Sequence, residues 1–136
     1  GQLHKRLVSG TGNKVEDFGV GFYTKYGDGG VDLSPIADLV KTEVFELGRA
    51  LGVPDSILMA KPTDGLWGDD RSDEDQIGAS YPELEWAMKE VEELKSPEEY
   101  SARENEVLEI YTRMNAANRH KMVPIPVCKI PEEFKA

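Results

Sequence analysis

The stretch FYTKYGDGGVDLSPIADLVKTEV, residues 22–44, carries the clearest structural signals in this 136-residue sequence. The glycines on both sides of Asp28 predict a tight loop, because glycine adopts backbone angles that other residues avoid. Ser34 and Pro35 are typical of a helix start, with serine as the cap and proline in the first turn. The apolar residues that follow recur at helical spacing, so we expect a helix that begins there and ends at Gly52.

Charged side chains within this stretch are the first candidates for a binding role. Lys25, Asp28 and Asp32 lie in or beside the glycine-rich loop. Such a loop can hold a polar ligand, and it can equally be a tight surface turn. Lys41 falls in the first turns of the predicted helix, where the helix dipole disfavours a cation by ~0.3–1 kcal/mol. That small cost hints at function, while a solvated helix face is the simpler interpretation.

Upstream of this stretch, LVSGTGNKVED (residues 7–17) predicts a buried strand over residues 6–9 that stops at the loop GTGN. Ligands of α/β proteins bind at strand ends, and the glycines of this loop allow close backbone approach. Thr11 offers a hydroxyl, and Glu16 offers a hard oxygen ligand of the kind that Mg²⁺ takes. A turn followed by a solvated carboxylate explains the same composition. The glycines of residues 18–26 argue against a helix there.

Downstream, residues 61–76 predict a loop long enough to act as a lid or a binding segment. Thr63 and Trp67 lie in it. The acidic run over residues 69–75 lacks the order of acids and glycine that a calcium-binding loop needs, so we expect it to be solvated.

Two capping-box patterns, beginning at Ser80 and Ser96, predict two further helices. Their apolar stripes are Leu84, Ala87, Met88 and Val91 in the first helix, and Val107, Leu108, Tyr111 and Met114 in the second. His120 and Lys121 fall at the end of the second helix, where cations complement the dipole; contact with an anionic ligand is the alternative. Residues 122–130 predict an extended tail.

Composition excludes several classes of protein. The net charge is −10, and 16 of the 26 acidic residues lie within residues 64–109, a surface that repels nucleic acid phosphates. No apolar run approaches the ~20 residues of a membrane span, and the first residues lack a signal-peptide pattern. Cys128 is the single cysteine, so no internal disulfide forms, and we expect a cytoplasmic protein.

The order of elements predicts an α-rich α/β domain. One or two strands cannot form an independent sheet core, so the remaining strands must come from outside this sequence. The sequence lacks the phosphate-loop pattern GxxxxGK[ST], the dinucleotide pattern GxGxxG and the zinc pattern HExxH.

Taken together, segments between residues 7 and 124 resemble the family of ammonia-dependent NAD synthetases. In chain order these segments are LVSGTGNKVED, FYTKYGDGGVDLSPIADLVKTEV, LGVP, KPTDGLW, DEDQIGASYPELE and RHKMVP. The resemblance implies a Rossmann-like adenine-nucleotide α-hydrolase fold, also called the N-type ATP pyrophosphatase fold. Residues 1–136 would be the C-terminal portion of a single domain, without its N-terminal strands.

The resemblance also implies a reaction: ATP-dependent amidation of deamido-NAD to NAD through an acyl-adenylate, with release of AMP and pyrophosphate. This is the last step of NAD biosynthesis. The substrates would be deamido-NAD, ATP and ammonia, with Mg²⁺ as cofactor, in a homodimer. The implied ATP contacts are Thr11, Lys41 and Thr63, the metal ligand is Glu16, the deamido-NAD contacts are Lys25, Asp32, His120 and Lys121, and the candidate catalytic residue is Asp28.

One part of the family pattern is missing. The glycine-serine pyrophosphate loop of the SGGxDS kind, which supplies a second metal ligand, does not occur in this sequence. We therefore expect the chain alone to be inactive. Two alternatives remain: an acidic interaction module formed by residues 80–114, and another ATP pyrophosphatase such as GMP synthetase, against which YTKYGDGG and RHKM argue.

Overall fold

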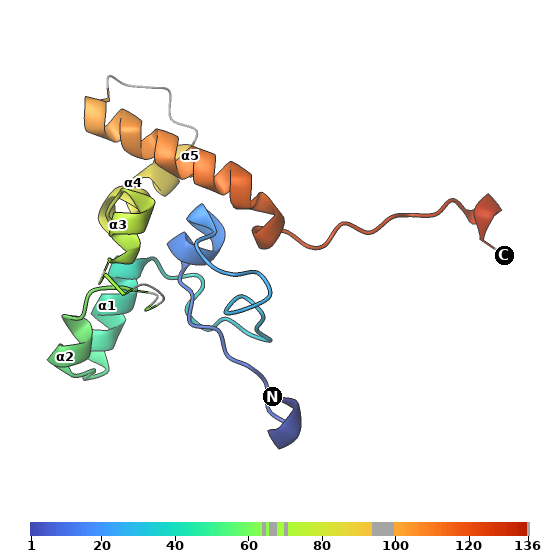
Figure 1. Ribbon diagram of the computed structural model, residues 1–136, viewed down its shortest axis with the longest axis horizontal. Coiled ribbons are helices and arrows are strands. Elements are labelled where there is room, and N and C mark those ends of the chain that lie inside the picture. Colours follow the sequence, from blue (N-terminus) through green and yellow to red (C-terminus); the bar gives the residue numbers. More distant parts are fainter. Residues whose placement is uncertain (64, 66–67, 70, 94–99, 136) are drawn as a thin grey trace.

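A computed structural model describes residues 1–63, 65, 68–69, 71–93 and 100–135, and these residues form mainly helices (Figure 1). In chain order the elements are η1 (Gln2–His4), η2 (Val15–Val20), α1 (Lys41–Ala50), α2 (Asp55–Leu58), α3 (Asp73–Ile77), α4 (Tyr81–Glu92), α5 (Ala102–Met122) and η3 (Glu132–Phe134). Within the described residues, β pairing is limited to one parallel bridge between Ser9 and Leu33. This is the α-rich arrangement that the sequence predicts.

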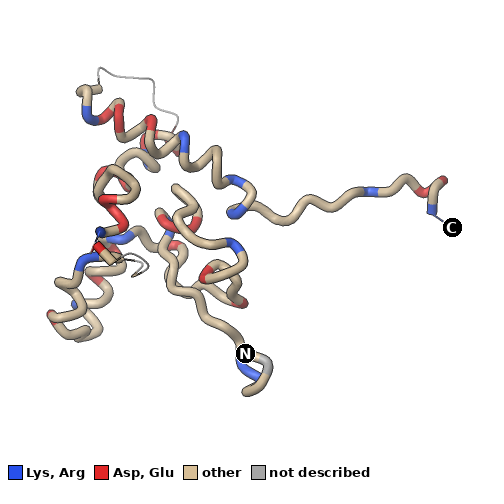
Figure 2. The backbone as a smooth tube through the Cα atoms, viewed as in Figure 1, with Lys and Arg blue, Asp and Glu red and all other residues tan. Residues whose placement is uncertain are grey.

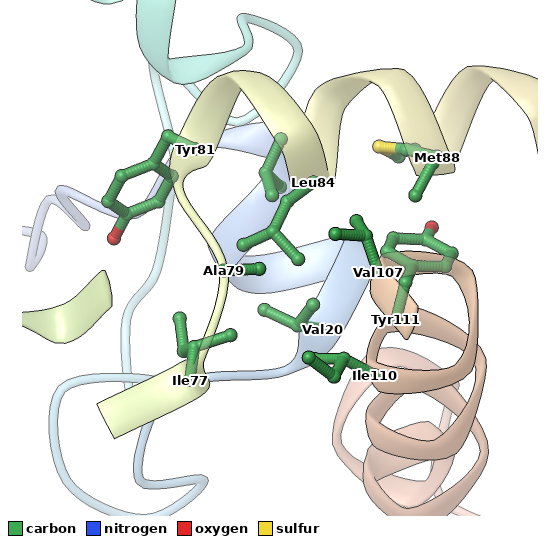
Figure 3. Close-up of a cluster of buried hydrophobic side chains, with 11 residues drawn as sticks. Val20, Ile77, Ala79, Tyr81, Leu84, Met88, Val107, Ile110 and Tyr111 are labelled. Carbon is green, nitrogen blue, oxygen red and sulfur yellow. The ribbon is translucent and has the colours of Figure 1, made fainter. Parts of the chain in front are cut away.

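The hydrophobic core lies where η2, α4 and α5 meet (Figure 3). Val15 and Val20 from η2, Leu84 from α4 and Val107 from α5 have almost no exposed surface. Burying each such side chain contributes about 1.5–3 kcal/mol, so these contacts hold the three elements together. The predicted stripes of α4 and α5 are confirmed in the buried residues Leu84, Ala87, Met88, Val107 and Tyr111, whereas Val91 is 39% exposed.

The prediction that residues 18–26 avoid helix is wrong for their first part, because η2 is a π-helix that ends at Val20. The Asn13 side-chain oxygen accepts hydrogen bonds from the backbone amides of Val15 (3.0 Å) and Glu16 (3.1 Å), which caps the start of the helix. Gly19 packs closely against α5, since an added Cβ would lie 3.3 Å from the Tyr111 ring. Gly21 then ends the helix with a φ of 66°.

The predicted helix start at Ser34 and Pro35 is also wrong. Residues 35–39 form turns, and α1 begins at Lys41. The Leu39 carbonyl accepts a hydrogen bond from the Lys14 amide (2.8 Å), so it is engaged with another segment. The predicted end at Gly52, which has a φ of 72°, is confirmed.

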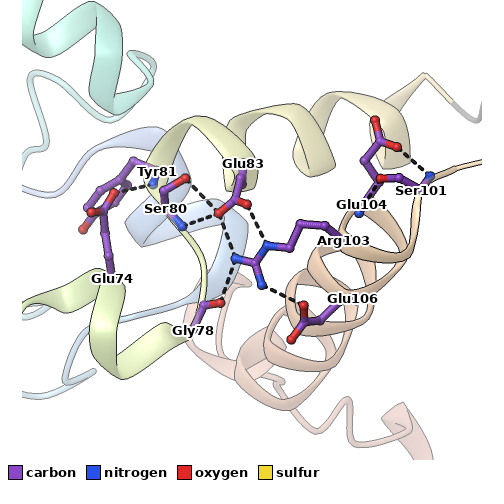
Figure 4. A network of polar contacts seen from close by, with 9 residues as sticks. All are labelled: Glu74, Gly78, Ser80, Tyr81, Glu83, Ser101, Arg103, Glu104 and Glu106. Carbon is purple, nitrogen blue, oxygen red and sulfur yellow. Dashed lines mark hydrogen bonds and ion pairs between the residues drawn. The ribbon is translucent and has the colours of Figure 1, made fainter.

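Capping boxes begin the later helices (Figure 4). The Ser80 amide donates to the Glu83 carboxylate (2.8 Å) at the start of α4, as the sequence predicts. A box that the sequence analysis missed, between Ser72 and Asp75, begins α3 inside the predicted loop. Ser101 caps α5, and the predicted cap at Ser96 lies outside the described residues.

The predicted buried strand over residues 6–9 is exposed instead. Leu7 is 71% exposed and Val8 is 41% exposed, and the β pairing of this segment with other described residues is limited to the bridge at Ser9. A strand is buried by neighbouring strands and covering helices, and the described residues provide neither for this segment. The predicted extended tail is confirmed, and it projects away from the helices (Figure 1).

Acidic residues concentrate on α3, α4 and the first half of α5, as the composition predicts (Figure 2). Among the described residues, we found no helix with the length and apolar character needed to cross a membrane.

Candidate functional site

Glu16 lies at the centre of a half-buried polar cluster. Its Oε1 atom accepts hydrogen bonds from Lys41 Nζ (2.8 Å) and from the Tyr81 hydroxyl (2.5 Å). Its Oε2 atom accepts the Asn13 amide at 3.3 Å. The Lys41 and Glu16 side chains are 19% and 15% exposed. The cluster therefore joins residues from η2, α1 and α4 into one site.

Lys41 is the first residue of α1, where the positive end of the helix dipole disfavours a cation. The ion pair with Glu16 offsets this cost. The Tyr81 ring adds a cation–π contact, because Lys41 Nζ lies 4.6 Å from its centroid. A lysine held in this way presents a fixed positive charge at a partly open site.

Asp73 belongs to the same cluster, although the sequence analysis assigned it to a solvated loop. It is 9% exposed, and its Oδ2 atom accepts a hydrogen bond from the Tyr81 hydroxyl at 3.3 Å. Burial follows from the α3 helix, which turns Asp73 and Ile77 inward. The solvated-loop prediction is therefore wrong for Asp73.

Thr63 is connected to this cluster through its own loop. The Asp73 amide donates to the Pro62 carbonyl (3.0 Å), and the Thr63 hydroxyl donates to the Arg71 carbonyl (3.3 Å). These bonds bring the two ends of residues 62–73 together. Trp67, which the sequence places in this loop, lies outside the described residues.

Metal binding at Glu16 depends on what else supplies oxygen ligands. The described residues contain no group of three or more His, Cys, Asp or Glu side chains arranged to hold a metal. Mg²⁺ is commonly bound by only one or two carboxylates, with phosphate and water completing its shell. Glu16 therefore fits as one ligand of a phosphate-bound Mg²⁺.

A second polar group forms where the end of α5 meets the segment that follows η2. Lys25 Nζ donates to the His120 carbonyl. Lys121 Nζ donates to the carbonyls of Gly21 (2.9 Å) and Tyr23 (2.7 Å), and the Tyr23 hydroxyl donates to the Lys121 carbonyl (2.6 Å). Three of the predicted substrate contacts, Lys25, His120 and Lys121, thus lie together.

Asp28 and Asp32, the two acidic candidates for substrate contacts, make different hydrogen bonds. Asp28 closes the predicted tight loop, because its Oδ1 atom accepts the Thr24 amide (2.7 Å). Asp32 instead accepts the Val8 amide (2.8 Å), so it stabilises the region of the Ser9–Leu33 bridge.

Asp17 follows Glu16 in η2, close to both polar groups in the chain. Burial, the negative charge of Glu16 and that of Asp28 raise the pKa of Asp17 to about 6. The Glu16 carbonyl accepts the Phe22 amide (3.0 Å), and the neighbouring Gly21 carbonyl accepts Lys121 Nζ (2.9 Å), so η2 and the residues that end it join the Glu16 cluster to the second polar group. Gly12 leaves room for this carboxylate, since an added Cβ would lie 2.0 Å from Asp17 Oδ1. Thr11, next to Gly12, is exposed.

Comparisons with known proteins identify relatives for this arrangement. A profile of the family described as "NAD synthase" matches residues 1–124. The chain is similar to NH(3)-dependent NAD(+) synthetases from Archaeoglobus fulgidus, with 46% identity over 125 residues, and Methanosarcina acetivorans, with 44% identity over 125 residues. The aligned regions cover 92% and 90% of this chain, and 47% and 48% of the relatives. The chain therefore spans about half the length of the curated relatives it matches.

A solved structure, described as NMN synthetase from Francisella tularensis, superposes with a TM-score of 0.74 and 34% identity. The match covers 96% of this chain and 49% of that one. The predicted fold, a portion of the N-type ATP pyrophosphatase fold, is thereby confirmed. On the profile match and the identity to its relatives, the chain belongs to the NAD synthase family.

Proposed function

We propose that this chain provides the C-terminal half of an NAD synthetase domain, which uses ATP and ammonia to convert deamido-NAD to NAD. The observation that carries the proposal is the Glu16–Lys41 ion pair, with the end of η2 linking it to the second polar group around Lys121. A carboxylate and a cation suited to nucleotide phosphates thus adjoin a second polar group suited to another substrate. The names of the relatives support the same reaction.

The chemistry assigns distinct tasks to the two groups. A carboxylate is a poor acyl donor, so the nicotinate carboxylate of deamido-NAD must first acquire a leaving group from ATP. Lys41 would stabilise the negative charge that develops on the departing pyrophosphate. Glu16 would hold Mg²⁺, which neutralises phosphate charge when it is bound. Thr11 and Thr63 would position ATP by hydroxyl contacts.

The second group would bind deamido-NAD and align its carboxylate. Lys25, His120 and Lys121 supply positive or polar contacts, Asp32 supplies a carboxylate, and Asp28 would lie near the incoming ammonia. Residues 61–72 would limit the access of water to the reactive adenylate. We further propose a homodimeric, cytoplasmic enzyme in which the other half of the domain completes the site.

A hybrid protein tests this proposal. In the hybrid synthetase, this chain replaces the matching half of the Archaeoglobus fulgidus relative. We expect ATP-, Mg²⁺- and ammonia-dependent formation of NAD from deamido-NAD, and no activity from the isolated chain. Lys41→Met is expected to lower kcat/KM by about 10²–10³-fold. Lys129→Met, in the exposed tail, serves as the matched control and is expected to retain activity.

A folded hybrid synthetase that makes no NAD would contradict the proposal. Equal losses in the Lys41 and Lys129 variants would contradict the role given to Lys41.

A second candidate function follows from the name of the solved structure, which is an NMN synthetase. Its product is a mononucleotide, so the same amidation could act on the corresponding mononucleotide carboxylate. The 46% identity to an NAD synthetase, against 34% to the NMN synthetase, favours the dinucleotide. Comparing kcat/KM for both substrates in the hybrid synthetase decides between them. The comparisons also favour amidation, of the dinucleotide or of the mononucleotide, over the two alternatives of GMP synthesis and a purely interacting module.

A further inference from the structure

Tyr81 has an unusual position, because one buried hydroxyl lies between two carboxylates from different segments. The residue is 3% exposed and begins α4. Its hydroxyl lies 2.5 Å from Glu16 Oε1 and 3.3 Å from Asp73 Oδ2. Its backbone amide also donates to Glu74 Oε1 (2.7 Å), which fixes the start of α4 against α3 (Figure 4).

The hydroxyl controls the direction of the Glu16 carboxylate. A tyrosine hydroxyl has a single proton, so Tyr81 shares it between the two carboxylates, and the shorter distance makes the bond to Glu16 the stronger one. The Tyr81 hydroxyl and Lys41 Nζ both donate to Oε1 of Glu16, so together they fix the rotation of the carboxylate. The other oxygen, Oε2, accepts the longer hydrogen bond from the Asn13 amide, at 3.3 Å. Burial of Tyr81 prevents water from taking the place of this donor.

On its other side, the hydroxyl meets the end of the loop that carries Thr63. Asp73 binds the Pro62 carbonyl through its amide and the Tyr81 hydroxyl through its side chain. Pro62 directly precedes Thr63. Tyr81 therefore connects the carboxylate proposed for metal binding to the base of the loop proposed for ATP binding.

We propose that Tyr81 is a positioning residue of the nucleotide site, which orients Glu16 and anchors the Thr63 loop through Asp73. This inference rests on the proposed function and deepens it. It predicts that the hydroxyl, rather than the ring, determines how well Glu16 contributes to binding of the metal–ATP complex.

The test compares Tyr81→Phe with Tyr111→Phe in the hybrid synthetase. Tyr111 is the matched control, because it is also 3% exposed but belongs to the α5 side of the core (Figure 3). We expect Tyr81→Phe to raise the Mg²⁺ concentration for half-maximal activity about 10-fold, in line with losses of residues that orient a ligand. The KM for ATP is expected to rise with it, while the KM for deamido-NAD stays within about twofold.

A direct measurement of metal binding accompanies the kinetics. Mn²⁺ is titrated into each variant in the presence of ATP, and free Mn²⁺ is followed by electron paramagnetic resonance. We expect about 10-fold weaker Mn²⁺ binding in Tyr81→Phe and unchanged binding in Tyr111→Phe.

Three outcomes would overturn the inference, and they are distinguishable. If the unmodified hybrid synthetase makes NAD but Tyr81→Phe matches Tyr111→Phe in Mg²⁺ dependence and Mn²⁺ binding, the positioning role is wrong and the proposed function stands. If the unmodified hybrid synthetase makes no NAD, the proposed function fails and this inference fails with it. A Tyr81→Phe variant in which every constant worsens together would indicate a general packing role and would also overturn it.

Discussion

Replacing Glu83 by glutamine is expected to destabilise the chain at neutral pH and to have little effect in strong acid. Arg103 holds the Glu83 carboxylate with two guanidinium nitrogens, at 2.8 Å and 2.9 Å, and the Ser80 amide adds a cap bond (Figure 4). The hydrogen bond from Arg103 and then that from Ser80 lower the pKa of Glu83 from 4.5 to about 2. The folded state therefore binds the ionised carboxylate more favourably than the unfolded state does.

The magnitude follows from this shift after correction for solvent. At about 1.4 kcal/mol for each pH unit, the full shift corresponds to roughly 3 kcal/mol. The Glu83 side chain is 33% exposed, however, and exposed ion pairs contribute only ~0.2–1 kcal/mol. Adding ~1 kcal/mol for the cap gives an expected loss of about 1–2 kcal/mol.

The pH dependence has a definite sign. Because the folded-state pKa of Glu83 is depressed, its stabilisation is complete above about pH 4.5 and disappears as the pH falls through 2. Urea denaturation followed by circular dichroism measures the difference between the two proteins at each pH. With a slope of about 2 kcal/mol/M, Glu83→Gln is expected to lower the midpoint by roughly 0.5–1 M at pH 7.

Glu106→Gln is the matched control, because Glu106 binds the same arginine through one nitrogen (2.8 Å) and its side chain is 59% exposed. Its effect is expected to stay within ~0.5 kcal/mol. An unchanged midpoint for Glu83→Gln at pH 7, or a difference that persists undiminished at pH 2, would refute the reasoning.

Three further stability changes are measurable in the same assay. Asn13→Ala is expected to cost about 2–4 kcal/mol, because it leaves two amides at the start of η2 without their side-chain acceptor; a loss below 1 kcal/mol would contradict this. Leu84→Ala is expected to cost about 2–5 kcal/mol, since the residue is fully buried at the centre of the core. Asp17→Asn is expected to stabilise the chain at pH 7 by about 1–2 kcal/mol, because the folded state raises the pKa of Asp17 from 3.8 to about 6 and solvent screening reduces the effect of this half-buried charge. This gain should vanish as the pH falls to 4, and a gain independent of pH would show that charge is not its cause.

Local sequence signals predicted much of the helical framework. The Ser80–Glu83 pair marked the start of α4, and Gly52 marked the end of α1, because capping depends on residues adjacent in the chain. Helix η2 could not be predicted in this way. Gly19 lies inside this helix, where it packs closely against Tyr111, a residue far away in the sequence. The burial of the segment at Leu7 and Val8 was misjudged, because an apolar run is buried only where other segments cover it, and the described residues leave these side chains exposed.

The candidate site shows the same division. Residue types and spacing singled out Glu16 and Lys41, and the structure brings them within 2.8 Å. Their assignment to ATP and Mg²⁺ stays a prediction, as do those of Thr11, Thr63 and the proposed deamido-NAD contacts. Tyr81 and Asp73 were missed, since a tyrosine in the first turn of a helix and an acid in an acidic run carry no distinctive local signal. They are recognised only in the structure, where the Tyr81 hydroxyl lies between the carboxylates of Glu16 and Asp73.

The bonds that join Tyr23 to Lys121 connect residues 98 positions apart. During translation, at about 5–20 residues per second, the early segment must wait roughly ten seconds before its anchor has been synthesised. Its side chains stay accessible to chaperones and proteases throughout that interval. A ribosome that stalls before it reaches the codon for Lys121 would therefore leave Tyr23 without this anchor.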